Sequence, residues 1–256
     1  MLKPAQRGFF VGYFKKVPAD VRALMIGFIV FFIAGMASAS VLMSLNTDSP
    51  GAGSYADELH GEHLVGTMEL KPYPILRVPA EGPKPARAVM LAGSGKFGVD
   101  ARALPLAGKT ARVGGIFVKR GDLEMLLVGG GDDLKAADLQ TSAAASIAAP
   151  QNLGRWRLTG EICDGKCAGG AMKPGTGLAH KACANLCLNG GVPPVFVSTA
   201  PIGGHRYFLL SSGDGGPMPA DLLDKTGVPI VLEGSVERRD DLLIFKVDRL
   251  ADGAQS

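Results

Sequence analysis

The pattern of apolar and polar residues divides the chain into one long apolar segment and a longer region of short apolar runs. Residues 23–45 are apolar or small and carry no charge. A segment of about 20 such residues spans a bilayer as a helix. Beyond residue 45 the apolar runs are short, and glycine, proline and aspartate interrupt them, which is typical of strands joined by turns. We therefore predict a mainly β protein that follows one N-terminal transmembrane helix.

An internal repeat predicts two β units. Residues 108–128 align without gaps on residues 227–247. A glycine, an arginine and an aspartate match in the two copies: Gly115, Arg120 and Asp122 in the first, Gly234, Arg239 and Asp241 in the second. Each copy has the pattern of a hairpin with a charged turn, preceded by short strands and one helical turn. Two such units resemble small OB-fold barrels, and one larger β-sandwich with repeated hairpins is the alternative.

These patterns define seven segments of the chain. They are a basic cytoplasmic segment (1–22), a transmembrane signal anchor (23–45), a linker (46–62), a first OB-like domain (63–134), a second linker (135–153), a second OB-like domain (154–250) with a Cys/His loop (163–194), and a tail (251–256). The alanine- and serine-rich residues 135–149 suit either a linker or a short helix.

The distribution of charge predicts the orientation in the membrane. Five of the 27 Lys and Arg residues, but one of the 24 acidic residues, lie within residues 1–22, so this segment accounts for the net charge of +3. The positive-inside rule places it in the cytoplasm and the rest of the chain in the periplasm, anchored in the inner membrane. A signal peptide cleaved after Ala39 is the alternative. The slightly acidic remainder argues against nucleic-acid binding.

All four cysteines of the chain lie close together in one loop with one of its four histidines. The candidate metal ligands are Cys163, Cys167, His180, Cys183 and Cys187. Three interpretations compete for them. Two disulfides suit an exported protein with an even number of cysteines. A metal site and a redox-active thiol pair are the others, and the C-x-x-x-C spacing of both pairs differs from the C-x-x-C of thioredoxin-like proteins.

Local helix geometry disfavours a disulfide between Cys183 and Cys187, and leaves open a shared metal ion or a bond from each to a cysteine of the first pair. Residues 180–188 lack glycine and proline, so we predict a helix there, with Cys183 and Cys187 one turn apart on one face. Their parallel Cβ directions disfavour a bond between them, and His180 lies on nearly the same face. With Cys167, these residues supply the four N and S ligands of a closed zinc site. The same donors suit an iron–sulfur centre or copper.

Other motifs predict little chemistry. The sequence lacks the signatures of c-type haem attachment, Rieske clusters, serine hydrolases and nucleotide-binding loops, and it offers no catalytic residues. His60 and His63 form an H-x-x-H pair that we expect to be solvated. We interpret residues 93–96, a glycine-rich Gly-Ser-Gly-Lys stretch, as a β turn, and the acidic pair Asp240 and Asp241 as turn residues.

The loop also resembles a known group of proteins. Residues 160–167 (GEICDGKC), 172–187 (MKPGTGLAHKACANLC) and 190–194 (GGVPP) are similar to the shared pattern of a group of exported, membrane-anchored bacterial proteins with OB-type modules. The strong match covers about 40 residues of the chain. The resemblance implies that Cys167, His180, Cys183 and Cys187 are the recurring positions and that Cys163 is an additional cysteine.

From these observations we predict a membrane-anchored, periplasmic protein that binds a metal or a metal cluster. It would act as a non-catalytic accessory or electron-transfer subunit of a membrane redox complex, with integral membrane or periplasmic redox proteins as partners. The alternative is a binding or assembly module that is stabilised by disulfides and binds no metal.

Overall fold

The computed structural model describes residues 17–46, 51–137 and 148–250. The chain divides into two units, residues 1–49 and residues 50–256. In the first, helix α1 (Ala19–Asn46) contains an apolar stretch, Val21–Met43, with a mean hydropathy of 2.3, and this stretch is long enough to cross a membrane. One apolar N-terminal helix is consistent with the predicted signal anchor and equally with a signal peptide. The predicted tail (251–256) and most of the predicted cytoplasmic segment lie outside the described residues.

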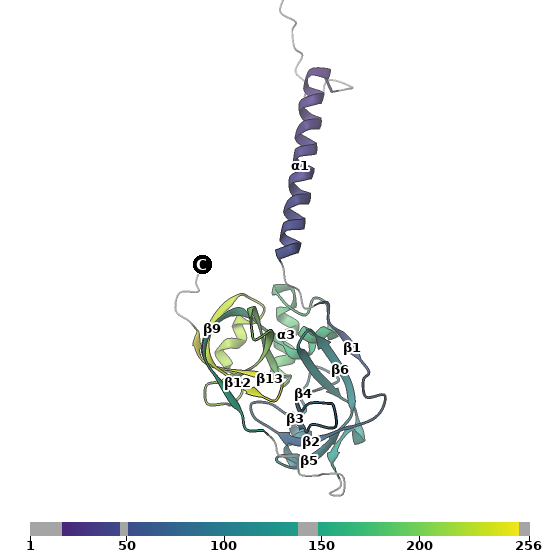
Figure 1. Ribbon diagram of the computed structural model, residues 1–256, viewed down its shortest axis with the longest axis vertical. Coiled ribbons are helices and arrows are strands. Elements are labelled where there is room, and N and C mark those ends of the chain that lie inside the picture. The colour runs from purple at the N-terminus through teal and green to yellow at the C-terminus, as the bar shows by residue number, and fades with distance from the viewer. Residues whose placement is uncertain (1–16, 47–50, 138–147, 251–256) are drawn as a thin grey trace, which may run out of the picture. The chain divides into compact units, whose positions relative to one another are not determined.

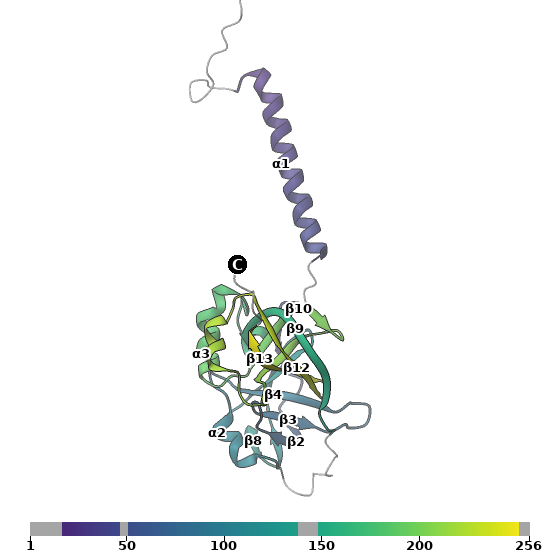
Figure 2. The same ribbon diagram turned by 90° about the vertical axis from the view of Figure 1, so that its left-hand side faces the viewer.

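Residues 50–256 contain two β-sheets, which confirms the mainly β prediction (Figures 1 and 2). The first sheet, here the first β unit, has eight strands in the order β1-β6-β7-β4-β3-β2-β5-β8. Its strands are β1 (Ser54–Ala56), β2 (Leu64–Glu69), β3 (Ile75–Val78), β4 (Arg87–Gly93), β5 (Thr110–Val113), β6 (Gly115–Arg120), β7 (Leu123–Val128) and β8 (Leu134–Ala136). Helix α2 (Asp100–Ala103) and the 3-10 turn η1 (Leu104–Leu106) precede β5, and a second 3-10 turn, η2 (Gly131–Asp133), precedes β8.

The second sheet, here the second β unit, closes on itself in the order β10-β11-β13-β12-β9. Its strands are β9 (Gln151–Asp164), β10 (Pro194–Ile202), β11 (His205–Ser212), β12 (Ile230–Arg239) and β13 (Leu242–Leu250). A 3-10 turn, η5 (Ala220–Lys225), precedes the last hairpin, as the sequence predicts. Buried and partly exposed residues alternate along β12, which is the pattern of a strand with one face on a core.

The predicted repeat is confirmed by the strand register. In the first unit Met90 of β4 pairs in parallel with Met125 of β7. In the second, Leu209 of β11 pairs in parallel with Ile244 of β13 at the corresponding positions. The last hairpins also share their register, since Gly115 pairs with Val128 and Gly234 with Val247. The strands of the two units differ next to these glycines. In the second unit β12 continues through a bulge between Glu233 and Gly234, whereas in the first unit Gly114 separates β5 from β6.

The two units share a core rather than standing apart on a linker. One apolar cluster lies within each sheet, and a third joins them. Corresponding residues of the two repeats meet in this joining cluster, including Met90 and Met125 from the first unit and Leu209 and Ile244 from the second. Three cysteines of the loop, Cys163, Cys167 and Cys187, belong to the same cluster. The cysteine loop is therefore part of the junction between the two units.

Aspartates of the two hairpin turns cross the junction. The Ala88 backbone N–H donates to Asp241 Oδ1 (2.7 Å), and the Arg206 N–H donates to Asp122 Oδ2 (3.1 Å). Asp122 and Asp241 are matching residues of the repeat, so each hairpin holds a strand of the other unit. Asp240 and Asp241 do lie in a turn, as predicted, and both also bind groups of the first β unit.

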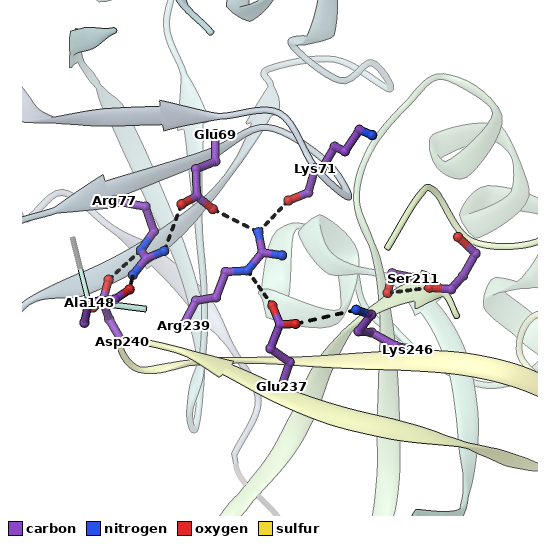
Figure 3. A network of polar contacts seen from close by, with 10 residues as sticks. Glu69, Lys71, Arg77, Ala148, Ser211, Glu237, Arg239, Asp240 and Lys246 are labelled. Atoms are coloured by element: carbon purple, nitrogen blue, oxygen red, sulfur yellow. Dashed lines mark hydrogen bonds and ion pairs between the residues drawn. The ribbon is translucent and has the colours of Figure 1, made fainter. Parts of the chain in front are cut away.

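A buried ion-pair network reinforces the junction (Figure 3). Arg77 of β3 donates from Nε to Asp240 Oδ2 (2.6 Å) and from Nη1 to Glu69 Oε1 (2.9 Å). Arg239 donates from Nη1 to Glu69 Oε2 (2.9 Å), so one carboxylate bridges two arginines. The side chains of Arg77 and Asp240 are 2% and 5% exposed. Buried charges of this kind are tolerated only when they are paired.

The segments predicted as linkers contribute to the structure where it describes them. Residues 54–56 form β1, which pairs with β6. Its backbone groups find partners at the edge of the sheet, so this part of the predicted linker is a strand. In the second linker, β9 begins at Gln151. A short helix is the other prediction for residues 135–149. Most of that segment, residues 138–147, lies outside the described residues.

Candidate metal centre

The cysteine loop is an insertion into the turn between the first two strands of the second unit. In the first unit Glu69 pairs with Ile75 across this turn, whereas in the second Cys163 pairs with Val195. The added residues form a single π-helical turn, η3 (Cys167–Ala171), a 3-10 turn, η4 (Leu178–His180), and helix α3 (Lys181–Asn189). The helix predicted from the absence of glycine and proline is confirmed by η4 and α3.

Four of the five predicted ligands fall into two overlapping groups. Cys167, His180 and Cys183 form one group, and Asp164, Cys167 and Cys187 form the other. Within each group the possible ligand atoms lie within 4.8 Å of one another, and Cys167 belongs to both. Sulfur atoms around one tetrahedral zinc ion are about 3.8 Å apart, because each Zn–S bond is about 2.3 Å long. Each group therefore has the spacing of ligands around one ion, and Cys167 joins the two groups.

Asp164, which the sequence analysis missed, orients the histidine. Its Oδ2 lies 3.0 Å from His180 Nε2, and its Oδ1 accepts the Cys167 N–H at 2.9 Å. The carboxylate is fully buried and both its oxygens are engaged. A proton on Nε2 leaves the lone pair of Nδ1 free to bind a metal. Carboxylates outside the ligand set orient metal-binding histidines in this way. The signal for this role was available, since Asp164 lies three residues before Cys167.

We expect the Asp164→Asn substitution to lower metal affinity without removing a ligand. An amide in place of the carboxylate loses the charge that supports the His180 proton on Nε2, and outer partners of this kind contribute about 10–100-fold to affinity. Competition against a chromophoric zinc chelator measures the change in the full-length protein in detergent. An affinity equal to that of the wild type would contradict the assigned role.

The thiols of Cys167 and Cys187 shift each other's pKa in opposite directions. Hydrogen bonding to Cys187 raises the pKa of Cys167, and the same bond lowers the pKa of Cys187. The ammonium groups of Lys96 and Lys166 act in the same direction on Cys187. Lys96 Nζ lies 2.8 Å from Cys183 Sγ and 3.8 Å from Cys187 Sγ. The site therefore combines close thiols with a positive charge that stabilises thiolates, the form that binds metals.

Cys163 stands apart from the other candidates. It lies in β9 and belongs to neither ligand group. Burial raises the pKa of its thiol, and the nearby Glu161 carboxylate raises the pKa further. A thiol with these properties is a poor nucleophile and a poor metal ligand at neutral pH. All four cysteines are free thiols in the structure, whereas the disulfide interpretation requires two bonded pairs.

Thiol reactivity should reflect these environments. In metal-free protein we expect Cys183, which is partly exposed, to react with iodoacetamide well before the buried Cys163. The difference in rate should be on the order of tenfold or more, since only accessible thiolate reacts. Mass spectrometry of the peptides after timed labelling at pH 8 measures each cysteine separately. Labelling of Cys163 as fast as Cys183 would contradict the description of its environment.

Two lysines near the site were not predicted from the sequence. Lys166, between Cys163 and Cys167, is 8% exposed, and its Nζ donates to the carbonyl oxygens of Ser94 and Gly95 at 2.5 Å each. Lys96 belongs to the glycine-rich stretch interpreted as a β turn. That stretch does connect β4 to α2, but it also packs against the cysteine loop.

The H-x-x-H pair, His60 and His63, belongs to neither ligand group. His63 Nε2 is 3.1 Å from Asp133 Oδ1, and Arg112 Nη2 lies 3.3 Å from the same imidazole nitrogen. His63 is therefore held by neighbouring side chains, which differs from the expectation of a solvated residue. The neighbouring His60 adopts a positive φ of 47° in a turn and is exposed.

Comparisons of the chain with protein families, curated proteins and solved structures find no match.

Proposed function

We propose that this protein is a membrane-anchored, periplasmic accessory subunit that holds one metal ion in its cysteine loop, at the junction of two OB-like β units. The ligands are the thiolates of Cys167, Cys183 and Cys187 and the Nδ1 atom of His180. The observation that carries the proposal is the convergence of Cys167, His180 and Cys183, whose ligand atoms lie within 4.8 Å of one another.

Charge balance favours a divalent ion. Three thiolates carry three negative charges in a largely buried site, and burial of a net charge is costly. A divalent ion together with the Lys96 ammonium neutralises them, whereas Cu(I) leaves one negative charge. Zinc prefers this set of N and S donors in tetrahedral geometry. A two-iron cluster would divide its ligands between two metal atoms. The two groups of candidate ligands share Cys167, so they fit a single ion better than a cluster.

The function of such a centre follows from its surroundings. With His180 and the three cysteines taken up as ligands, and Asp164 held by His180 and the Cys167 N–H, we assign the ion a structural or electron-transfer role. Zinc has no redox chemistry and would hold the cysteine loop in the shape that a membrane partner recognises. One observation favours electron transfer through iron or copper instead: Cys183 is partly exposed, while Cys167 and Cys187 are buried. The partners would be integral membrane or periplasmic redox proteins.

Metal analysis of the natively purified full-length protein tests the proposal. We expect one zinc ion per chain and four free thiols after anaerobic denaturation in the presence of a chelator. Stoichiometric iron or copper in place of zinc would favour the electron-transfer role. A protein without metal and without free thiols would overturn the proposal and support the alternative of a disulfide-stapled assembly module.

A further inference from the structure

The ligand groups reach solvent at one side chain. His180, Cys167 and Cys187 are 3%, 2% and 1% exposed, whereas Cys183 is partly exposed. A metal ion bound by these residues would therefore exchange with solvent past Cys183. Lys96 occupies this position, because its Nζ lies 2.8 Å from Cys183 Sγ.

Lys96 is held at the site by contacts on both sides of its loop. On one side, the Lys166 ammonium binds the carbonyl oxygens of Ser94 and Gly95. On the other side, the Gly98 N–H donates to the Gly190 carbonyl at 2.8 Å. Lys166 and Gly190 both belong to the cysteine loop. The first β unit thus presents Lys96 to the second through a loop that is fastened at two points.

A glycine makes the close approach of this loop possible. A Cβ atom at Gly190 would overlap the backbone carbonyl oxygen of Lys96. The backbone of Gly190 is at φ −81° and ψ 0°, which other residues adopt without strain. The absence of a side chain at Gly190 therefore serves the contact with the Lys96 loop rather than the backbone conformation.

The position of Lys96 has two physical consequences. Its ammonium donates to sulfur, and hydrogen bonds to charged acceptors are about twice as strong as neutral ones. It also covers the partly exposed ligand, so water or a competing chelator would have to displace it. The side chain itself is exposed, which means that its replacement leaves the packing of the core unchanged.

We propose that Lys96 is a positioning residue that closes the exposed edge of the metal centre and retains the bound ion. The inference rests on the proposed metal-binding function. Metal release then requires the loop of residues 93–98 to lift from α3, so the first β unit controls exchange at a site whose ligands all come from the second.

Zinc release measured with a chromophoric chelator tests this role in the full-length protein in detergent. We expect Lys96→Gln to release zinc about tenfold faster than the wild type, within the range of other outer-sphere contacts. Lys96→Arg, which keeps the charge, should restore most of the retention. Lys109→Gln is the matched control, since this exposed lysine of the same unit donates to the Pro105 carbonyl and should have no effect.

A second variant separates the position of the loop from its charge. Gly190→Ala should displace the loop and accelerate release while Lys96 keeps its ammonium. Thermal unfolding of the metal-free variants checks that each one folds. Zinc release from Lys96→Gln at the wild-type rate would overturn this inference and leave the metal site intact. A wild-type protein that binds no zinc, iron or copper would instead overturn the proposed function and the inference with it.

Discussion

Replacing Cys167 with serine is expected to abolish stoichiometric metal binding. Cys167 is the one residue that belongs to both ligand groups, so its loss leaves neither group complete. Structural zinc sites contribute apparent binding free energies on the order of 10–16 kcal/mol, and loss of one thiolate removes a large part of this. Metal content after gel filtration, together with zinc titration against a competing chelator, measures the loss.

Cys163→Ser is the matched control for this experiment. Cys163 also lies in the junction core and is 1% exposed, so both substitutions place a hydroxyl in a buried site within the same loop. Because Cys163 is outside the ligand groups, this variant should retain one metal ion per chain. Equal loss of metal in both variants would show that burial, rather than ligation, accounts for the effect of Cys167→Ser.

The second large effect is expected from Arg77→Ala, which removes the centre of the buried network between the two β units. The substitution leaves Asp240, 5% exposed, as a buried carboxylate without its arginine. Breaking one partner of a buried pair typically costs about 3–5 kcal/mol, because the remaining charge is uncompensated. Urea unfolding of the full-length protein in detergent, followed by tryptophan fluorescence, measures the change.

An exposed ion pair provides the comparison. Arg157 and Glu233 form a pair at 3.0 Å in the second unit, and the Arg157 side chain is 58% exposed. Exposed pairs contribute about 0–1 kcal/mol, so Arg157→Ala should unfold close to the wild-type midpoint. A loss of stability in Arg77→Ala no larger than that in Arg157→Ala would contradict the role of the buried network.

The repeat explains how the candidate metal centre relates to the fold. Both units use the same strand register, and corresponding residues of the two copies meet in the shared core. In the first unit the turn from Glu69 to Ile75 is short, whereas the second unit carries the cysteine loop at this turn. The loop therefore joins an interface that the repeat itself builds, and the first unit contributes Lys96 to it.

The sequence predicted the features that depend on neighbouring residues. An uninterrupted apolar run predicts α1, because the length of such a run is a local property. The gapless repeat predicts matching hairpins, because strand register follows from the spacing of turns and apolar residues. Cys183 and Cys187, together with His180, were predicted to share a helical region, because the periodicity of a helix places residues three and four apart on one face.

Tertiary structure alone decided which side chains complete the site and the junction. Lys96 is 87 residues from Cys183, and Arg77 is 163 residues from Asp240. Neither contact has a local pattern, since both arise only when the two units pack against each other. The separation of Cys163 from the ligand groups is of the same kind. Its spacing from Cys167 is like that of a ligand pair, but Cys163 lies in β9 and pairs with Val195 of β10, and the position of a strand is set by its partners across the sheet.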